Sequence, residues 1–308
     1  MSIKVRSLTK IYGTQKAVNN ISFEIQKGEI VGFIGPNGAG KSTTMKILTG
    51  FLPPDSGEAF INMLNVRDYN LKIKSLLGYL PENNPLYPEM YVREYLEYVL
   101  KIYMGSFQTD EIIKKYLSVD EVIELTGLVS EQHKKIGALS KGYRQRVGLA
   151  QAINHNPDIL ILDEPTSGLD PGQIIEIRNL ILSLGKDKTI LLSTHLMQEV
   201  KAICNRVIMI NKGEIIADGS AEEIRSAQES TITIILELDK ISNPEKINEI
   251  EGVLQYKNLG ENKLLIESTE DKDIRPKLFS FAVENELTIL SLQKKEKNLE
   301  EVFRDLMG

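Results

Sequence analysis

Two stretches of the sequence contain residues suited to holding phosphate groups. The first is GPNGAGKST, residues 35–43. Its glycines let backbone N–H groups close around phosphates, and a helix that follows directs its positive end at them. In this pattern Lys41 reaches the β- and γ-phosphates, and the Ser42 hydroxyl ligates Mg²⁺. We therefore predict a nucleotide-binding loop composed of Gly35, Pro36, Asn37, Gly38, Ala39, Gly40, Lys41, Ser42 and Thr43.

The second stretch is GALSKGYRQRVGLAQAI, residues 137–153. Ser140 and Gly142 stand just ahead of an apolar-periodic segment, which is how a helix that can bind an anion begins. Because residues 35–43 already form a complete phosphate cradle, the chain has no evident use for this second site within one copy.

Acidic residues and a histidine follow two apolar runs. In LILDEPTSGLD, residues 160–170, Asp163 suits a contact to Mg²⁺, and Glu164 is placed to polarise an attacking water. His195, in the stretch LLSTHL at residues 191–196, ends the second apolar strand. Alone, such an Asp-Glu pair is more often a solvated turn, and a lone histidine is more often structural. Parallel sheets gather ligand contacts at the carboxyl ends of their strands, so together with the loop these residues favour hydrolysis.

The elements that must position these residues are expected to be strands alternating with helices. Residues 3–34 alternate β-rich runs with turns and predict a sheet whose last strand enters the loop. The apolar run at 158–164 is typical of a strand buried on both faces. Helical spacing from about residue 90 predicts a helical insertion, placed at roughly 84–155. The alternation predicts an α/β domain with a mostly parallel sheet over residues 1–220.

The pattern changes after residue 220. Runs of strand and helix character follow in the order β-α-β-β-α-β, with a short helix, NLEEVFRDLM, after them. This order matches the split βαβ, or ferredoxin-like, type of small α+β domain, which we place at residues 221–308. No catalytic pair or glycine-rich loop stands out there, so a packing or dimer-stabilising role is favoured over ligand sensing.

Composition excludes several classes of protein. The chain has 308 residues and a formal net charge of -6, so it lacks the basic field that would hold nucleic acid. Its one cysteine, Cys204, forms no internal disulfide and fits a reducing compartment. No apolar run approaches the roughly 18 residues needed to span a bilayer. We expect a cytoplasmic protein whose membrane role comes through a partner.

Residues 3 to about 220 resemble the ATP-binding cassette (ABC) ATPases. Beside the loop at 35–43 (Walker A) and residues 159–164 (Walker B), ALSKGYRQR is similar to the family's LSGGQ signature, and SGLD, residues 167–170, to its D-loop. His195 matches the switch histidine, Tyr12 the aromatic residue that stacks on adenine, and Glu82 the Q-loop position. Asp170 ends the D-loop match.

The resemblance implies a P-loop NTPase fold, with a mixed sheet and a helical subdomain, and a Mg²⁺-dependent ATPase. It also accounts for the second anion site. In this family Ser140 and Gly142 of one copy would cap the γ-phosphate held by the other, so two subunits pack head to tail around ATP. The implied partners are a second ATPase subunit and a separate transmembrane permease, contacted near Glu82 and the helical insertion. The subunit would then lie on the cytoplasmic face of the inner membrane.

Three positions depart from the family pattern. Lys141 and Tyr143 replace Gly and Gln of the signature, but Ser140 and Gly142 remain, so activity is expected to survive. Glu82 stands where most relatives carry Gln, and an ionised carboxylate donates no hydrogen bond. The same Glu is familiar in the exporter branch with separate membrane subunits, which includes drug-efflux and gliding-motility ATPases, and SKGYRQRVGLAQAI is similar to the gliding-motility type.

Two other functions compete with the transport ATPase. One is a soluble ABC ATPase that acts on nucleic acid or the ribosome. Such proteins usually carry two cassettes or a long coiled coil, whereas this chain has one set of motifs and no long heptad run between Thr43 and Ala138. The other is a module that binds ATP without hydrolysing it. The presence of both Glu164 and His195 argues against that module.

Overall fold

The computed structural model describes residues 1–106, 116–227, 231–240, 244–269, 273–295 and 299–307. Residues 107–115 of the expected helical insertion, and residues 230, 243 and 298 of the expected second domain, lie outside this set. The chain divides into two compact units, Met1–Ala221 and Glu222–Gly308. Each unit is described by itself.

The first unit contains an antiparallel sheet with the order β2-β1-β4-β5. Its strands are β1 (Ile3–Tyr12), β2 (Gln15–Ile25), β4 (Ser56–Ile61) and β5 (Leu64–Asn65). The sequence predicted that residues 3–34 form a single sheet, which is wrong for β3 (Ile30–Ile34). That strand pairs with β8 and β9 in a second sheet. The reason is burial: every residue of β3 is buried, whereas β2 alternates and leaves part of one face exposed.

The second sheet has the order β10-β9-β3-β8-β7-β6. Besides β3 its strands are β6 (Leu77–Leu80), β7 (Ile159–Asp163), β8 (Thr189–Thr194), β9 (Arg206–Asn211) and β10 (Glu214–Gly219). Five of them run parallel and β10 is antiparallel to β9. The sheet is thus mostly parallel, as predicted, and because β3, β8 and β7 are parallel neighbours their carboxyl ends lie at one edge.

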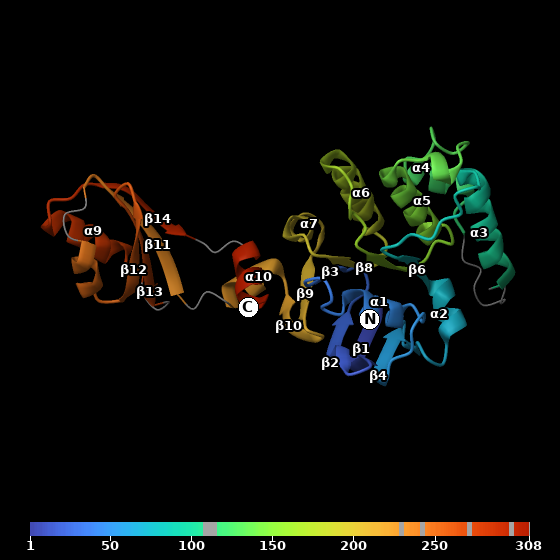
Figure 1. Ribbon diagram of the computed structural model, residues 1–308, viewed down its shortest axis with the longest axis horizontal. Coiled ribbons are helices and arrows are strands. Elements are labelled where there is room, and N and C mark those ends of the chain that lie inside the picture. Colours follow the sequence, from blue (N-terminus) through green and yellow to red (C-terminus); the bar gives the residue numbers. More distant parts are fainter. Residues whose placement is uncertain (107–115, 228–230, 241–243, 270–272, 296–298, 308) are drawn as a thin grey trace. The chain divides into compact units, whose positions relative to one another are not determined.

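Helices lie on both faces of this sheet (Figure 1). They are α1 (Lys41–Leu48), α2 (Asn70–Leu76), α3 (Val92–Ser106), α4 (Val119–Leu125), α5 (Lys141–Ile153), α6 (Pro171–Leu184) and α7 (Met197–Ile203), with a 3₁₀ turn at Ile136–Ala138. Helix α6 begins where the sequence has a cap: Asp170 caps the first turn, and Pro171 is the first helical residue.

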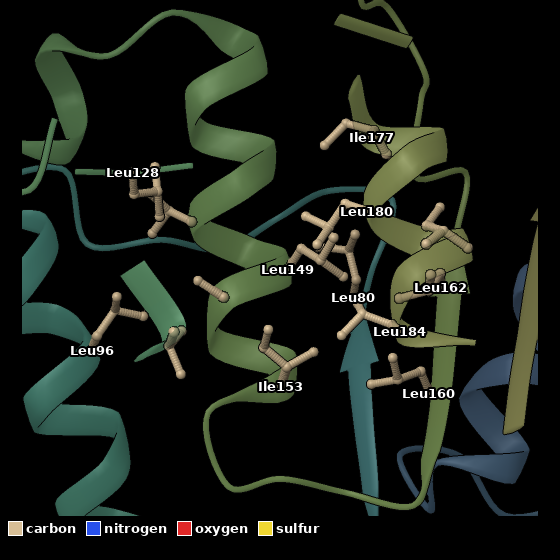
Figure 2. Packing of buried hydrophobic residues seen from close by; sticks show 14 of the residues in the cluster. Leu80, Leu96, Leu128, Leu149, Ile153, Leu160, Leu162, Ile177, Leu180 and Leu184 are labelled. Atoms are coloured by element: carbon tan, nitrogen blue, oxygen red, sulfur yellow. The ribbon is translucent and has the colours of Figure 1, made fainter. Parts of the chain in front are cut away.

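Two hydrophobic clusters cover opposite faces of the six-stranded sheet. One lies between this sheet and the antiparallel sheet and includes side chains of α1. The other joins β6, β7 and β8 to helices α3 to α6, and Figure 2 shows its side chains between the helices and the strands. Leu160 and Leu162 of β7 enter this second cluster, whereas Ile159 and Ile161 enter the first. Because both faces are buried, β7 has a continuous apolar sequence.

The second unit is built around an antiparallel sheet with the order β12-β13-β11-β14. Its elements are β11 (Thr231–Leu238), β12 (Val253–Gly260), β13 (Lys263–Thr269), α9 (Arg275–Glu284), β14 (Ile289–Lys295) and α10 (Leu299–Met307), with α8 (Ala221–Ala227) at the boundary. The expected helix at 243–252 is the 3₁₀ segment Pro244–Glu249 (η2), bounded by a proline and by Gly252, which has a φ of +102°. The strand order is that of a split βαβ domain.

Candidate nucleotide-binding site

The glycine-rich loop connects β3 to α1 and has a conformation that only glycine adopts without strain. Gly38 and Gly40 have φ values of +80° and +114°. A Cβ on Gly40 would lie 2.4 Å from the carbonyl oxygen of Ala17, and one on Gly35 would lie 2.2 Å from that of Ile210. Backbone thus closes around the loop from two sides, and α1 begins directly after it at Lys41. Its positive end suits an anion.

Lys41 is buried at the base of this loop. Its Nζ donates to the carbonyl oxygens of Gly35, at 2.7 Å, and Pro36, at 3.2 Å. The same ammonium lies 3.6 Å from Oε1 of Glu164. The loop therefore holds a fixed positive charge close to the carboxylate that follows β7.

Ser42 and Asp163 form the pair expected to bind a metal ion. The Ser42 hydroxyl donates to Oδ1 of Asp163 at 3.1 Å, and the buried Ser193 hydroxyl donates to the same oxygen at 2.6 Å. No group of three or more His, Cys, Asp or Glu side chains among the described residues is placed to hold a metal. One hydroxyl and one carboxylate are a donor set that fits Mg²⁺, which takes one or two protein oxygens and completes its shell with phosphate and water.

Glu164 and His195 are in direct contact. Nδ1 of His195 lies 2.9 Å from Oε2 of Glu164. The backbone N–H of Glu164, whose φ is +50°, donates to the Ser193 hydroxyl at 2.9 Å. The other oxygen, Oε1, is buried and has no hydrogen-bond partner among the described residues. One oxygen is therefore held in place while the other is available to accept a proton from water.

Ser140 and Gly142 begin helix α5, as predicted. The Ser140 hydroxyl caps the helix by accepting from the N–H of Tyr143 at 3.3 Å. Gly142 is buried against Gln173 of α6, where a Cβ would lie 2.5 Å from Cδ. No hydrogen bond or ion pair within the described part of the chain joins Ser140 to residues 35–43. Asp170 caps α6 through the N–H of Gln173, at 2.9 Å.

Tyr12 and Glu82 occupy exposed positions. Tyr12 ends β1 and is 50% exposed, with the Lys10 ammonium 5.9 Å from its ring centroid. Glu82 follows β6 and shares a cavity with Ser42 and Asp163. Burial, and then the charges of Asp163 and Glu82, raise the pKa of the nearby Tyr79 phenol. Tyr79 is therefore a neutral hydroxyl over the whole physiological range.

The cavity beside Glu82 has a volume of about 730 Å³. It runs from Ser42 and Asp163 along the space between α1, α2 and α3. Its outer part is lined by large side chains that are exposed: Phe51, Leu71, Tyr87, Tyr98 and Ile102. We call this part the tyrosine-lined groove. The groove connects Ser42 and Asp163 to an apolar surface of the same unit.

Sequence analysis missed two polar residues of the site. Ser193 bridges Asp163 and the backbone of Glu164. Glu199 of α7 is fully buried and hydrogen-bonds to Thr166 and Thr194. The one available signal was the pair Ser193-Thr194 directly before His195, at the end of a strand that neighbours β7.

Several known proteins resemble this chain. Residues 18–167 match the family model of the ABC transporter. The chain is 32% identical over 319 residues to the bacitracin transport ATP-binding protein BcrA of Bacillus licheniformis, covering 99% of this chain and 97% of that protein. It is also 32% identical over 311 residues to the linearmycin resistance ATP-binding protein LnrL of Bacillus subtilis, covering 99% and 98%.

Solved structures resemble most of the chain. A dimeric post-hydrolysis state of the ATP-binding cassette MJ0796, bound to ADP and phosphate, has a TM-score of 0.63 at 26% identity, covering 71% of this chain and 98% of that one. An ATP-binding subunit of an ABC transporter has a TM-score of 0.64 at 28% identity, covering 74% and 93%.

Fold and site define a P-loop ATPase with an α-helical insertion. The chain belongs to the ATP-binding proteins of ABC transporters. It is the subunit that binds and hydrolyses ATP, as the family resemblance implied. Proteins of this family act in pairs and together with membrane permease subunits. Within the part of the chain that the structure describes, every helix is too short or too polar to cross a bilayer.

Proposed function

We propose that this subunit hydrolyses Mg²⁺-ATP between two copies of the chain and thereby drives a separate permease from the cytoplasmic face of the membrane. One observation supports this most directly. Glu164 is buried between Lys41 and His195, with one oxygen held by the histidine and the other without a hydrogen-bond partner among the described residues. A buried carboxylate oxygen that accepts no hydrogen bond, with the Lys41 ammonium 3.6 Å away, suits a base that orients a water molecule beside the phosphates.

Each side chain then has a distinct task. Lys41 binds the β- and γ-phosphates, within the backbone cradle of residues 35–43. Ser42 and Asp163 would hold Mg²⁺, which supplies neutralisation of the charge that develops on the phosphate oxygens. Glu164 accepts the proton of the attacking water, and His195 holds the Glu164 carboxylate by its second oxygen. Tyr12, exposed at the end of β1, offers a ring face to adenine.

The other copy completes the site. Ser140 is exposed at the start of α5, and among the described residues no hydrogen bond or ion pair joins it to the loop of its own chain. Gly142 follows it in the first turn of α5 and is buried against Gln173. A triphosphate has enough charge to engage donors from two sides, and hydrolysis removes the group that joins them. The dimeric state of the cassette MJ0796, bound to ADP and phosphate, supports this pairing.

The tyrosine-lined groove is our proposed contact for the permease. Aromatic residues with one apolar face and one polar end are enriched at protein interfaces. The groove ends at Glu82, Ser42 and Asp163, so an occupant would touch residues that sense the nucleotide. The names of BcrA and LnrL concern bacitracin transport and linearmycin resistance, which supports export as the direction.

Glu164→Gln tests the catalytic proposal. The amide keeps the shape of the side chain but does not accept a proton, so turnover should fall by roughly a hundredfold or more. The variant should accumulate as an ATP-bound dimer in light scattering with Mg²⁺-ATP. Glu58→Gln, an exposed carboxylate of β4, is the matched control and should behave as wild type. Full turnover by Glu164→Gln, or a monomer at saturating ATP, would refute the proposal.

Tyr98→Glu tests the groove. Tyr98 lines the groove and is 44% exposed, so a charge there should prevent co-purification of the permease while ATPase activity of the isolated subunit persists. Met63→Glu is the control, because Met63 is 70% exposed and lies outside the groove. Equal recovery of permease with both variants would exclude the groove as the contact.

A further inference from the structure

Helix α7 carries a carboxylate that the reaction described above does not use. Glu199 is 0% exposed. Its Oε2 accepts from the Thr194 hydroxyl at 2.7 Å, and its Oε1 is hydrogen-bonded to the Thr166 hydroxyl. Taking a carboxylate out of water carries a large desolvation penalty, and these hydrogen bonds offset it.

The two threonines flank the proposed catalytic groups. Thr194 is the last residue of β8 and directly precedes His195. Thr166 lies two residues after Glu164, in the loop that leaves β7. The Glu199 carboxylate therefore links the chain segment that carries Glu164 to the segment that carries His195.

The direction of the bonds favours a carboxylate at this position. The Thr194 oxygen already accepts from the N–H of Leu196 at 3.0 Å, so its own proton is free to go to Glu199. A carboxylate accepts from both threonines at once, whereas the amide of glutamine has one acceptor oxygen and would direct N–H donors at the second hydroxyl.

Both catalytic segments need such support. Glu164 has a φ of +50°, a conformation that non-glycine residues rarely adopt. The His195 side chain is 45% exposed, and Leu196 beside it is also exposed. Packing alone thus holds His195 only in part, and a misplacement of about 1 Å in an active site can cost on the order of a hundredfold in rate.

We propose that Glu199 is a positioning residue for ATP hydrolysis: through Thr166 and Thr194 it holds Glu164 and His195 in the geometry in which they act together. This inference rests on the proposed roles of Glu164 and His195. A merely structural anchor of α7 would instead affect stability and nucleotide binding with no selective effect on turnover.

The test compares Glu199→Gln and Glu199→Ala with Gln198→Ala, an exposed neighbour on the same helix. We expect kcat to fall by roughly ten- to a hundredfold in the alanine variant and less in the glutamine variant, with KM for ATP within about twofold of wild type. Gln198→Ala should retain wild-type kcat. Thermal unfolding and fluorescent-ATP binding identify a variant that fails to fold, in which case the milder glutamine variant decides.

A double-mutant cycle supplies the second readout. If Glu199 acts through the threonines, the kcat effects of Glu199→Gln and Thr194→Val are non-additive, and the double variant is about as slow as the slower single one. Additive effects, or a folded Glu199→Gln with kcat within about twofold of wild type, would overturn the inference. Glu164→Gln separates the two levels. If it is inactive while Glu199→Gln is unaffected, only the positioning role fails, whereas an active Glu164→Gln removes the proposed function itself.

Discussion

Ser193→Ala removes the hydroxyl that joins the two acidic residues after β7. In the structure this buried hydroxyl donates to Oδ1 of Asp163 at 2.6 Å and accepts from the backbone N–H of Glu164 at 2.9 Å. Alanine leaves the N–H buried without its acceptor and takes one donor from the carboxylate. Among the described residues of β8, no other side chain makes both contacts.

The magnitude follows from these two bonds. A hydrogen bond to a charged group contributes about 1.5–3 kcal/mol, and a buried donor left without a partner costs about 1–3 kcal/mol. Asp163 retains the bond from Ser42, so we expect a loss of about 3 kcal/mol in the free energy of unfolding. Because Asp163 would then orient the metal less well, kcat should fall by roughly ten- to a hundredfold.

Equilibrium urea unfolding followed by circular dichroism measures the first effect, and phosphate release with Mg²⁺-ATP measures the second. Ser183→Ala is the control. Ser183 is an exposed serine of α6 whose hydroxyl donates to the Leu180 carbonyl at 2.8 Å, and its loss should change stability by no more than about 0.5 kcal/mol. Both serines belong to the unit Met1–Ala221, so the same transition reports both. A Ser193→Ala protein as stable and as active as Ser183→Ala would refute this account of the site.

Three further outcomes are expected. Gly40→Ala should lower the melting temperature and abolish binding of fluorescent ATP, because φ is +114° there and the new Cβ would lie 2.4 Å from the Ala17 carbonyl; wild-type affinity would contradict this. Cys204 should resist iodoacetamide at pH 8 in the native protein and react after unfolding in urea, because burial, assisted by the charge of Glu199, raises the pKa of its thiol from 9.0 to about 12 and keeps it protonated; mass spectrometry showing equal labelling would exclude that protection. Arg206→Lys should lower the free energy of unfolding in urea by less than about 1 kcal/mol, because the bidentate ion pair of Arg206 with Asp218 is partly exposed. A larger loss would show that solvent screens this ion pair less than its exposure indicates.

Sequence patterns were sufficient for the elements with strong local signals. The glycine spacing of residues 35–43 defined the loop that leads into α1. The apolar runs of β7 and β8 indicated buried parallel strands because their composition follows from cover on both faces. The order of strands along the second unit also followed from its alternating runs.

Other features depend on contacts between distant segments. The turn at residues 26–29 gives no sign that β3 leaves the sheet of β1 and β2, since the change is set by which layers cover each strand. β4, α2 and β6 have six, seven and four residues, which is too few to show a clear periodicity. Glu199 appears in the sequence as one charge on a helical segment, and its partner Thr166 lies 33 residues away. Its burial is what distinguishes Glu199 from an ordinary surface charge, and the sequence alone does not show that burial.

The alternation of β7 makes the order of its acidic residues as important as their presence. Odd-numbered positions up to Asp163 face the cluster that contains α1, which is why this carboxylate meets Ser42. The strand then ends, and the inverted φ of Glu164 turns the next side chain toward Lys41 and His195. A double variant with glutamate at position 163 and aspartate at position 164 would preserve charge and composition. It would nevertheless place each carboxylate in the other's surroundings. Whether a residue of β7 stands at an odd or an even position thus decides which side chains of this enzyme it can contact.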